Sequence, residues 1–366
     1  MDMEGFYEAA ERIQRFCEML QDKRSQEIFW ARLRYDMEPT KNNALILEDL
    51  ADVYLDEIKT CASNQPDKNI ILFGAGDYGR FLGKRILQEG EDFSGFCDTK
   101  AGKDCETITI LEQEKRIFSL DHLLDSAEES YVAITTSDYF MEIKSLLQEK
   151  HFPMNHILNC VHMKQYFAFP ELFPQGTAFV DAGCCDGADS IRFAKLCKGA
   201  YSKILVFEPD YDNLQKCVLN ISNESIFNVD YIEAGLGRRS GERHFHKDLN
   251  GASHFIERSE NASFLAHGQR DTGTAEMVHE VALDDYTENI TVGFIKMDIE
   301  GAEFDALQGA QNTILRDKPL LAICVYHRRG DVLAIMDYLH SLVPDYRFWL
   351  RHYGPLQNET VLYAAL

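Results

Sequence analysis

Two carboxylates follow short apolar runs at positions where they could bind a nucleotide-like cofactor. Asp181 ends the run that begins at Phe179, and the chain then enters a turn with glycines at 183 and 187. In a dinucleotide site such a turn cradles a pyrophosphate, which the Asp181 carboxylate would repel. The carboxylate would instead attract the ammonium and sulfonium groups of S-adenosylmethionine, which has no phosphate.

Glu208 supplies the second carboxylate, directly after the apolar run 204–207. It stands 21 positions after Gly187, close to the interval of about 20 residues at which an acid meets the ribose hydroxyls in a βαβ unit. An ordinary α/β turn followed by a strand with an acidic end would give the same pattern. The residues predicted to contact the cofactor are Asp181, Gly183, Cys185, Gly187, Glu208 and Pro209.

A second glycine-rich loop follows the apolar run 70–73 and has the pattern GxGxxG over residues 74–79. Asp98 ends the next apolar run, nineteen residues after Gly79. This context predicts a second nucleotide site made by Gly74, Gly76, Gly79 and Asp98. The surrounding segment resembles the small nucleotide-binding-like domains of nucleotide-sugar and acetyltransferase-type proteins. The same glycines also permit close packing of a helix on a strand, so both interpretations stay open.

Four segments of the chain, taken in order, resemble the motifs of FkbM-type methyltransferases. They are DAGCCDG at 181–187, FEP at 207–209, VALDDY at 281–286 and IKMDIEGAE at 295–303. The resemblance covers roughly 175–366 and implies methyl transfer from S-adenosylmethionine to an oxygen, commonly a hydroxyl of a sugar or natural product. Family members commonly place Ala-Asn where this chain has Cys184-Cys185, so the loop here lacks an amide side chain that could reach the cofactor.

The candidate catalytic groups lie at the ends of two predicted strands, 292–297 and 320–325. Ligands collect beyond the carboxyl ends of parallel strands. Alternation along an extended chain places Lys296, Asp298 and Glu300 on one face. Asp298 is the first candidate for the base or acceptor-orienting group, with Lys296 as its ion-pair partner or as a stabiliser of the forming alkoxide. A buried Lys-Asp pair that only fixes the strand end is the alternative. His327 is the other candidate base, and an exposed loop histidine is its alternative.

The acceptor is expected to bind in the polar, histidine-rich segment 242–279, with Ser253 and Glu300 as predicted substrate contacts. Glu300 and Glu303 also fall in the first turn of a predicted helix, where the helix dipole stabilises carboxylates. Asp298, Glu300 and Glu303 could hold a divalent cation, but the sequence identifies no further oxygen ligands beside them. No metal is therefore predicted.

The composition excludes several classes of partner. The formal net charge is -23 and no basic stripe is evident, which argues against nucleic acid. No apolar run approaches the roughly 18 residues of a membrane span and the first residues are acidic, so a cytoplasmic protein without a membrane segment is expected. The ten cysteines are scattered through apolar segments, as is typical of buried thiols.

The elements that must position these groups predict an α/β fold with two Rossmann-like domains. Residues 1–66 have helical periodicity and are expected to pack on the protein or to form a homodimer contact. Residues 67–160 form the first Rossmann-like domain, and 175–366 form the second, the methyltransferase domain. Five βα steps and a final hairpin predict a seven-stranded class I methyltransferase sheet whose last strand is antiparallel.

The leading hypothesis is an S-adenosylmethionine-dependent O-methyltransferase that acts on a hydroxyl of a saccharide or related small metabolite. The alternative is a non-catalytic scaffold that retains a methyltransferase fold and binds a nucleotide or nucleotide-sugar. A third interpretation, an NAD-dependent oxidoreductase, is less favoured because no catalytic Tyr-Lys pair accompanies the loop at Gly74.

Overall fold

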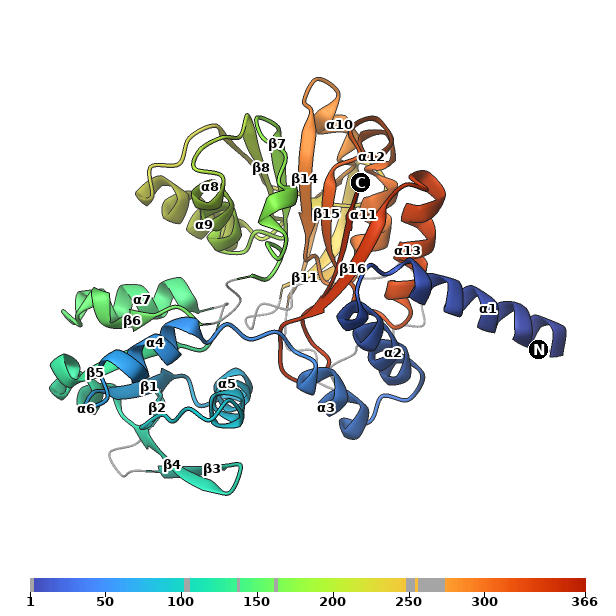
Figure 1. The fold of residues 1–366 in the computed structure, drawn as a ribbon. Coiled ribbons are helices and arrows are strands. Elements are labelled where there is room, and N and C mark those ends of the chain that lie inside the picture. The colour runs from blue at the N-terminus through green and yellow to red at the C-terminus, as the bar shows by residue number, and fades with distance from the viewer. Residues whose placement is uncertain (1–2, 102–105, 137–138, 161–163, 248–253, 256–273) are drawn as a thin grey trace. The chain divides into compact units, whose positions relative to one another are not determined.

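A computed structural model (Figure 1) describes residues 3–101, 106–136, 139–160, 164–247, 254–255 and 274–366. The chain divides into two compact units. One contains Met1–Leu50, Tyr166–His352 and Leu356–Leu366, and the other contains Ala51–Gln165 and Tyr353–Pro355. The helical segment predicted at 1–66 is therefore divided between the units after Leu50.

The larger unit is built on a seven-stranded sheet with the strand order β16-β17-β15-β14-β7-β8-β9. All neighbouring strands are parallel except β17, which is antiparallel to both β15 and β16. This order and the single antiparallel strand confirm the predicted class I methyltransferase sheet. The strands are β7 (Ala178–Ala182), β8 (Lys203–Phe207), β9 (Val229–Ile232), β14 (Val292–Met297), β15 (Leu320–Cys324), β16 (Arg347–His352) and β17 (Thr360–Ala365).

The helices of this unit alternate with the strands. The N-cap Asp210 shows how the sequence sets a boundary, because its carboxylate accepts hydrogen bonds from the backbone N–H groups of Asp212 and Asn213. The helices are α8 (Ala188–Leu196), α9 (Tyr211–Asn223), α10 (Asp284–Thr287), α11 (Glu303–Gln308), α12 (Gln311–Asp317) and α13 (Asp331–Leu342). None of the helices that the structure describes is long and apolar enough to cross a membrane.

The two faces of the sheet carry different side chains because neighbouring residues of a strand point to opposite faces. On one face Phe179 and Phe294 pack with ring centroids 5.0 Å apart, and Phe167, Phe173 and Phe193 join them. The opposite face belongs to an aliphatic core that includes residues of α13 and of the N-terminal helices.

The N-terminal helices are an integral part of this unit. They are α1 (Met3–Met19), α2 (Lys23–Met37) and α3 (Lys41–Asp49). Phe16, Ile28 and Phe29 are buried in the aliphatic core. Ser25 exchanges hydrogen bonds with the backbone of Leu350 in β16, at 3.3 and 2.9 Å. The prediction that this segment packs on the protein is therefore confirmed for α1–α3.

A four-stranded sheet in the order β10-β13-β11-β12 contains the described residues of the segment 242–279, in which the acceptor was expected to bind, together with β10 from the chain before it. Its strands are β10 (Gly235–Leu236), β11 (Gly241–Lys247), β12 (His254–Phe255) and β13 (Thr274–Val281). Strands β11 and β13 are antiparallel over seven residue pairs.

The second unit has a six-stranded sheet in the order β3-β4-β2-β1-β5-β6, mostly parallel. Its strands are β1 (Asn69–Phe73), β2 (Gly95–Cys97), β3 (Glu106–Ile110), β4 (Gln113–Phe118), β5 (Ser130–Ile134) and β6 (Ile157–Leu158), and its helices are α4 (Asp56–Asn64), α5 (Asp77–Gln88), α6 (Leu120–Asp125) and α7 (Phe140–Glu149). The antiparallel hairpin of β3 and β4 was not predicted.

Candidate active site

The loop between β7 and α8 owes its shape to its glycines. Gly183 and Gly187 have φ values of +74° and +82°, in the left-handed region that favours glycine. A Cβ atom on Gly183 would lie 1.9 Å from the carbonyl oxygen of Asp298. Glycine at 183 therefore lets the loop approach the chain that leaves β14.

Glu208 lies against this loop, as the spacing predicted. Its Oε2 accepts a hydrogen bond from the backbone N–H of Cys185 at 3.1 Å, and its Oε1 accepts one from Asp210 at 3.0 Å. The residue is only 6% exposed, and burial raises the pKa of its carboxyl to about 7. The structure thus brings together the predicted cofactor residues at 183–187 and at 208–209.

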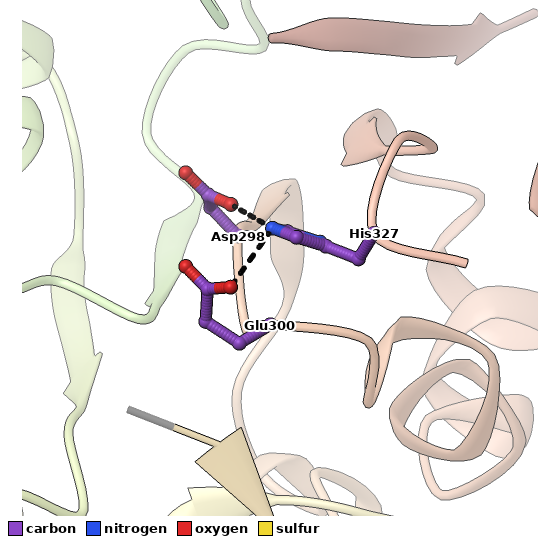
Figure 2. A group of neighbouring side chains, drawn as sticks. All are labelled: Asp298, Glu300 and His327. Carbon is purple, nitrogen blue, oxygen red and sulfur yellow. Dashed lines mark ion pairs between the residues drawn. The ribbon is translucent and has the colours of Figure 1, made fainter. Parts of the chain in front are cut away.

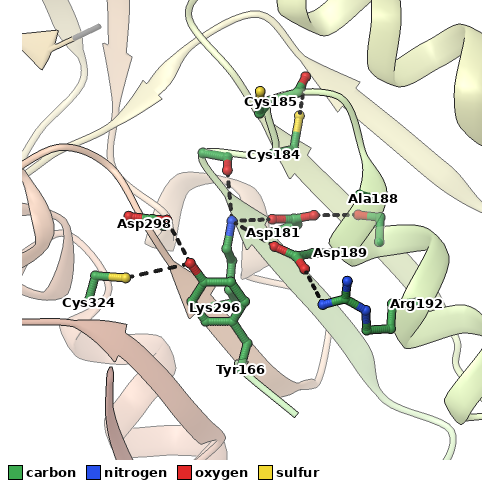
Figure 3. Close-up of polar contacts among 12 residues, drawn as sticks. Tyr166, Asp181, Cys184, Cys185, Ala188, Asp189, Arg192, Lys296, Asp298 and Cys324 are labelled. Carbon is green, nitrogen blue, oxygen red and sulfur yellow. Dashed lines mark hydrogen bonds and ion pairs between the residues drawn. The ribbon is translucent and has the colours of Figure 1, made fainter. Parts of the chain in front are cut away.

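Asp181 and Lys296 form a buried ion pair, with 3.1 Å between Nζ and Oδ1 (Figure 3). Asp181 is fully buried and its Oδ2 also accepts a hydrogen bond from Ser190 at 2.6 Å. The Lys296 ammonium donates to the carbonyl of Gly183 at 2.7 Å and lies 3.5 Å from Asp189. Burial opposes the charge on Lys296, but Asp181 and Asp189 outweigh it and hold the pKa of the ammonium well above its usual value.

This geometry revises two predicted roles. Asp181, predicted to bind the cofactor ammonium, neutralises Lys296 beneath the loop. Lys296, predicted as a catalytic partner of Asp298, makes its ion pair with Asp181 because the two residues are direct neighbours in the β7–β14 register. The buried Lys-Asp pair left open by the sequence is therefore formed, but with a different aspartate.

Asp298 lies just beyond β14 and is held by two tyrosines. Its Oδ2 accepts a hydrogen bond from the Tyr166 hydroxyl at 2.6 Å, and its Oδ1 accepts one from Tyr326 at 3.3 Å. Burial tends to raise the pKa of Asp298, but His327, Lys296 and the Tyr166 hydroxyl together lower it below its usual value. Asp298 is therefore an ionised carboxylate at neutral pH.

Sequence reasoning missed both tyrosines. Tyr326 lies two residues after the end of β15 and directly before His327, so attention to every polar residue near a strand end would have found it. Tyr166 follows the segment 161–163, far from Asp298 in the sequence, and no local pattern connects the two.

The side chain of His327 is 6% exposed, so it is not the exposed loop histidine considered from the sequence. Its Nδ1 lies 2.9 Å from Oε1 of Glu303, and its Nε2 lies 3.4 Å from Asp298 and 3.4 Å from Glu300 (Figure 2). Burial tends to lower the pKa of His327, but Glu303 and Glu300 outweigh it and raise the pKa well above its usual value. Asp298, Glu300 and His327 thus converge at the ends of β14 and β15.

A cavity of about 670 Å³ lies at the carboxyl end of β9, the strand next to β8. Its volume is in the range of small-ligand sites. Its lining includes Tyr231, Glu233, His279, Glu280 and Tyr286. Of the two predicted substrate contacts, Glu300 lies beside His327, and Ser253 lies outside the residues that the structure describes.

The glycine loop of the second unit has a clear packing role. A Cβ atom on Gly79 would lie 2.0 Å from the carbonyl oxygen of Gly74, so glycine permits the turn into α5. Asp98 is close to the loop, as predicted, and its Oδ2 accepts a hydrogen bond from the backbone N–H of Ala75 at 3.1 Å. The carboxylate therefore occupies a loop N–H that a phosphate would otherwise use.

Comparisons with known proteins agree with the motif resemblance. Residues 181–354 match the family model of the methyltransferase FkbM domain. No curated protein sequence matches the chain. Among solved structures, methyltransferase FkbM from Methylobacillus flagellatus KT is 16% identical, with a TM-score of 0.41, covering 89% of this chain and 99% of that one.

Two further solved structures cover a smaller part of the chain. An rRNA methylase from Streptococcus thermophilus is 16% identical, with a TM-score of 0.34, and covers 55% of this chain and 92% of its own. The protein SMU.1697c from Streptococcus mutans, in complex with SAH, is 14% identical, with a TM-score of 0.33, and covers 55% and 95%.

Proposed function

We propose that the protein, whose residues 181–354 match the family model of the methyltransferase FkbM domain, transfers a methyl group from S-adenosylmethionine to a hydroxyl oxygen of a saccharide or related small metabolite. One observation carries the proposal. The glycine loop with Glu208 at the ends of β7 and β8 stands beside Asp298 and His327 at the ends of β14 and β15. A donor site and an acceptor site therefore share one edge of the sheet.

The loop fits a positively charged donor better than a dinucleotide. The cations closest to it are already paired, Lys296 with Asp181 and Arg192 with Asp189, which leaves little to attract a pyrophosphate. Glu208 would hold the ribose hydroxyls, and the cavity at the end of β9 would take the adenine. When bound, S-adenosylmethionine would supply a methyl group on a sulfonium, and the thioether would be the leaving group when a nucleophilic oxygen takes the methyl carbon.

Asp298 would act on the acceptor. The ionised Asp298 carboxylate accepts a hydrogen bond from the acceptor hydroxyl and receives its proton as the carbon–oxygen bond forms. The carbon–sulfur bond breaks at the same time and its electron pair stays on sulfur, so charges and atoms balance. A positioned base of this kind contributes about 10²- to 10⁴-fold to the rate, and alignment of the reactants contributes more.

Calorimetric titration of the purified full-length protein with S-adenosylmethionine tests the proposal. We expect micromolar binding, and a loss of at least about tenfold in Glu208→Ala because the ribose hydroxyls lose their acceptor. Glu224→Ala is the matched control, since the Glu224 side chain pairs with Lys195 on α8. Unchanged affinity in Glu208→Ala would contradict the assignment of the pocket.

A screen of hydroxylated sugars then tests the acceptor. Methylation is followed by release of S-adenosylhomocysteine, and NMR of the product identifies the methylated atom. Binding of S-adenosylmethionine without turnover on any hydroxyl acceptor, or methylation of a nitrogen or carbon, would refute the O-methyltransferase assignment.

A further inference from the structure

Three side chains of types that ligate metals lie close together, those of Asp298, Glu300 and His327. One ligand atom from each side chain lies within 4.8 Å of the other two. Figure 2 shows the two carboxylates, from the chain after β14, turned toward the imidazole, which follows β15. The three residues belong to two segments of chain, so their convergence is a property of the fold.

The distances in this ion-pair cluster also suit a metal site. A charged hydrogen bond from an imidazolium to a carboxylate is about 2.7–2.9 Å long, but Nε2 of His327 lies 3.4 Å from both Asp298 and Glu300. Ligand atoms that surround one ion at about 2.1 Å are themselves about 3.0–3.4 Å apart. The imidazole is thus placed between the two carboxylates at ligand-to-ligand spacing.

The orphaned nitrogen of His327 is the second observation. Its side chain is 6% exposed, and Nε2 is buried without a hydrogen-bond partner among the described residues. The opposite ring nitrogen, Nδ1, lies 2.9 Å from Glu303, which is itself 1% exposed and accepts a hydrogen bond from the backbone N–H of Ile299. Histidines that bind metals almost always donate their other N–H to a carboxylate, a backbone carbonyl or a water, which fixes the ring and its tautomer. Glu303 is a carboxylate in this position.

We propose that Asp298, Glu300 and His327 bind one divalent transition-metal cation at the acceptor side of the site. A set of one imidazole and two carboxylates suits Mn²⁺, Fe²⁺, Co²⁺ or Zn²⁺, whereas Mg²⁺ and Ca²⁺ prefer oxygen ligands alone. Three protein ligands leave coordination positions open. Hydroxyl oxygens of a polyhydroxylated acceptor suit these positions.

The role of the cation in catalysis rests on the proposed function. A hydroxyl bound to the cation loses its proton more readily because the positive charge stabilises the alkoxide. With the cation bound, Asp298 would serve as its ligand in place of the role of base given above, and the acceptor proton would pass to solvent water. The carbon–oxygen bond would form as the carbon–sulfur bond breaks, and the electron pair would remain on sulfur. Binding of the cation itself does not depend on this role.

Electron paramagnetic resonance of free Mn²⁺, titrated with the chelator-treated full-length protein, tests the site without any measurement of activity. We expect one bound Mn²⁺ per chain and at least about tenfold weaker binding in both Glu300→Gln and His327→Ala. Glu300→Gln keeps the test meaningful if His327→Ala fails to fold, because the Glu300 side chain is 30% exposed. Asp230→Asn, on the surface of β9, is the matched control.

Two results would overturn the proposal: no Mn²⁺ bound at millimolar concentration, or Mn²⁺ affinity in Glu300→Gln equal to that of the control. Titration with S-adenosylmethionine on the same preparation separates the two proposals. If the protein binds S-adenosylmethionine but not Mn²⁺, only the metal site is refuted. If it binds Mn²⁺ but not S-adenosylmethionine, only the methyl donor is refuted.

Discussion

Substitution of Lys296 by methionine tests whether this lysine is structural or catalytic. The substitution removes an ammonium that is 2% exposed and leaves the fully buried Asp181 carboxylate with Ser190 as its remaining hydrogen-bond donor among the side-chain contacts described above. Methionine has a similar length and shape, so it fills most of the space. The dominant effect is therefore an uncompensated buried charge.

The expected loss of unfolding free energy is about 3–5 kcal/mol, the typical cost of breaking a buried ion pair by removing one partner. For a unit of this size each kcal/mol lowers the melting temperature by about 2–4 °C. The melting temperature of the unit that contains β7 and β14 should therefore fall by roughly 6–20 °C. Scanning calorimetry measures the change.

Lys203→Met is the matched control, on the neighbouring strand β8. Lys203 lies 2.7 Å from Asp230, but the two side chains are 34% and 50% exposed, so the pair contributes at most about 1 kcal/mol. The double substitution Lys296→Met with Asp181→Asn should recover part of the lost stability, because no charge is left buried. A Lys296→Met protein as stable as Lys203→Met, but devoid of turnover, would refute the structural role and restore the catalytic one.

Two further predictions concern the carboxylates at the site. Tyr166→Phe removes the 2.6 Å hydrogen bond to Asp298 and should cost about 1.5–3 kcal/mol at neutral pH. Asp298 has a lowered pKa in the folded state, so the stabilisation by its carboxylate exists above pH 4 and disappears on acidification. Tyr166→Phe should therefore unfold at a higher pH than the wild type in an acid titration. Tyr326→Phe, which removes a longer bond of 3.3 Å, should raise the midpoint pH of acid unfolding less, and equal midpoints in the two variants would contradict the reasoning. Glu208 has a pKa raised from 4.5 to about 7, so its favourable contribution is complete below pH 4.5 and about 3 kcal/mol is lost as the pH rises through 7. Urea unfolding at pH 5 and pH 8 should show this loss of stability in the wild type and a smaller loss in Glu208→Gln. Asp331, whose pKa is also raised to about 7, contributes equally to the pH dependence of the two proteins. The same pH dependence in the wild type and in Glu208→Gln would argue against a raised pKa for Glu208.

The sequence was most informative where one local pattern determines the structure. An apolar strand followed by an acid and a glycine turn located the loop at 183–187 and Glu208, because ligands gather at strand ends whatever the rest of the fold. The alternation of strands and helices, with a final hairpin, was sufficient to predict the seven-stranded sheet.

Contacts between distant segments were beyond the same reasoning. Lys296 was paired with Asp298 because the two share a strand face, but its true partner Asp181 lies across from it on β7. The convergence of Asp298, Glu300 and His327 was not predicted for a similar reason, since His327 joins the two carboxylates only after β14 and β15 are adjacent. The hairpin of β3 and β4 was missed because its residues are mostly exposed and polar.

The dependence of the core on α1–α3 has a consequence for synthesis of the chain. Ser25 pairs with Leu350, 325 residues later, and residues 51–165 of the second unit are made in between. At a ribosomal rate of about 5–20 residues per second, the apolar faces of α1 and α2 wait roughly 15–65 seconds for β16. The second unit, with its own core, can fold during that interval. The larger unit therefore completes its core last, when β16 reaches α1 and α2.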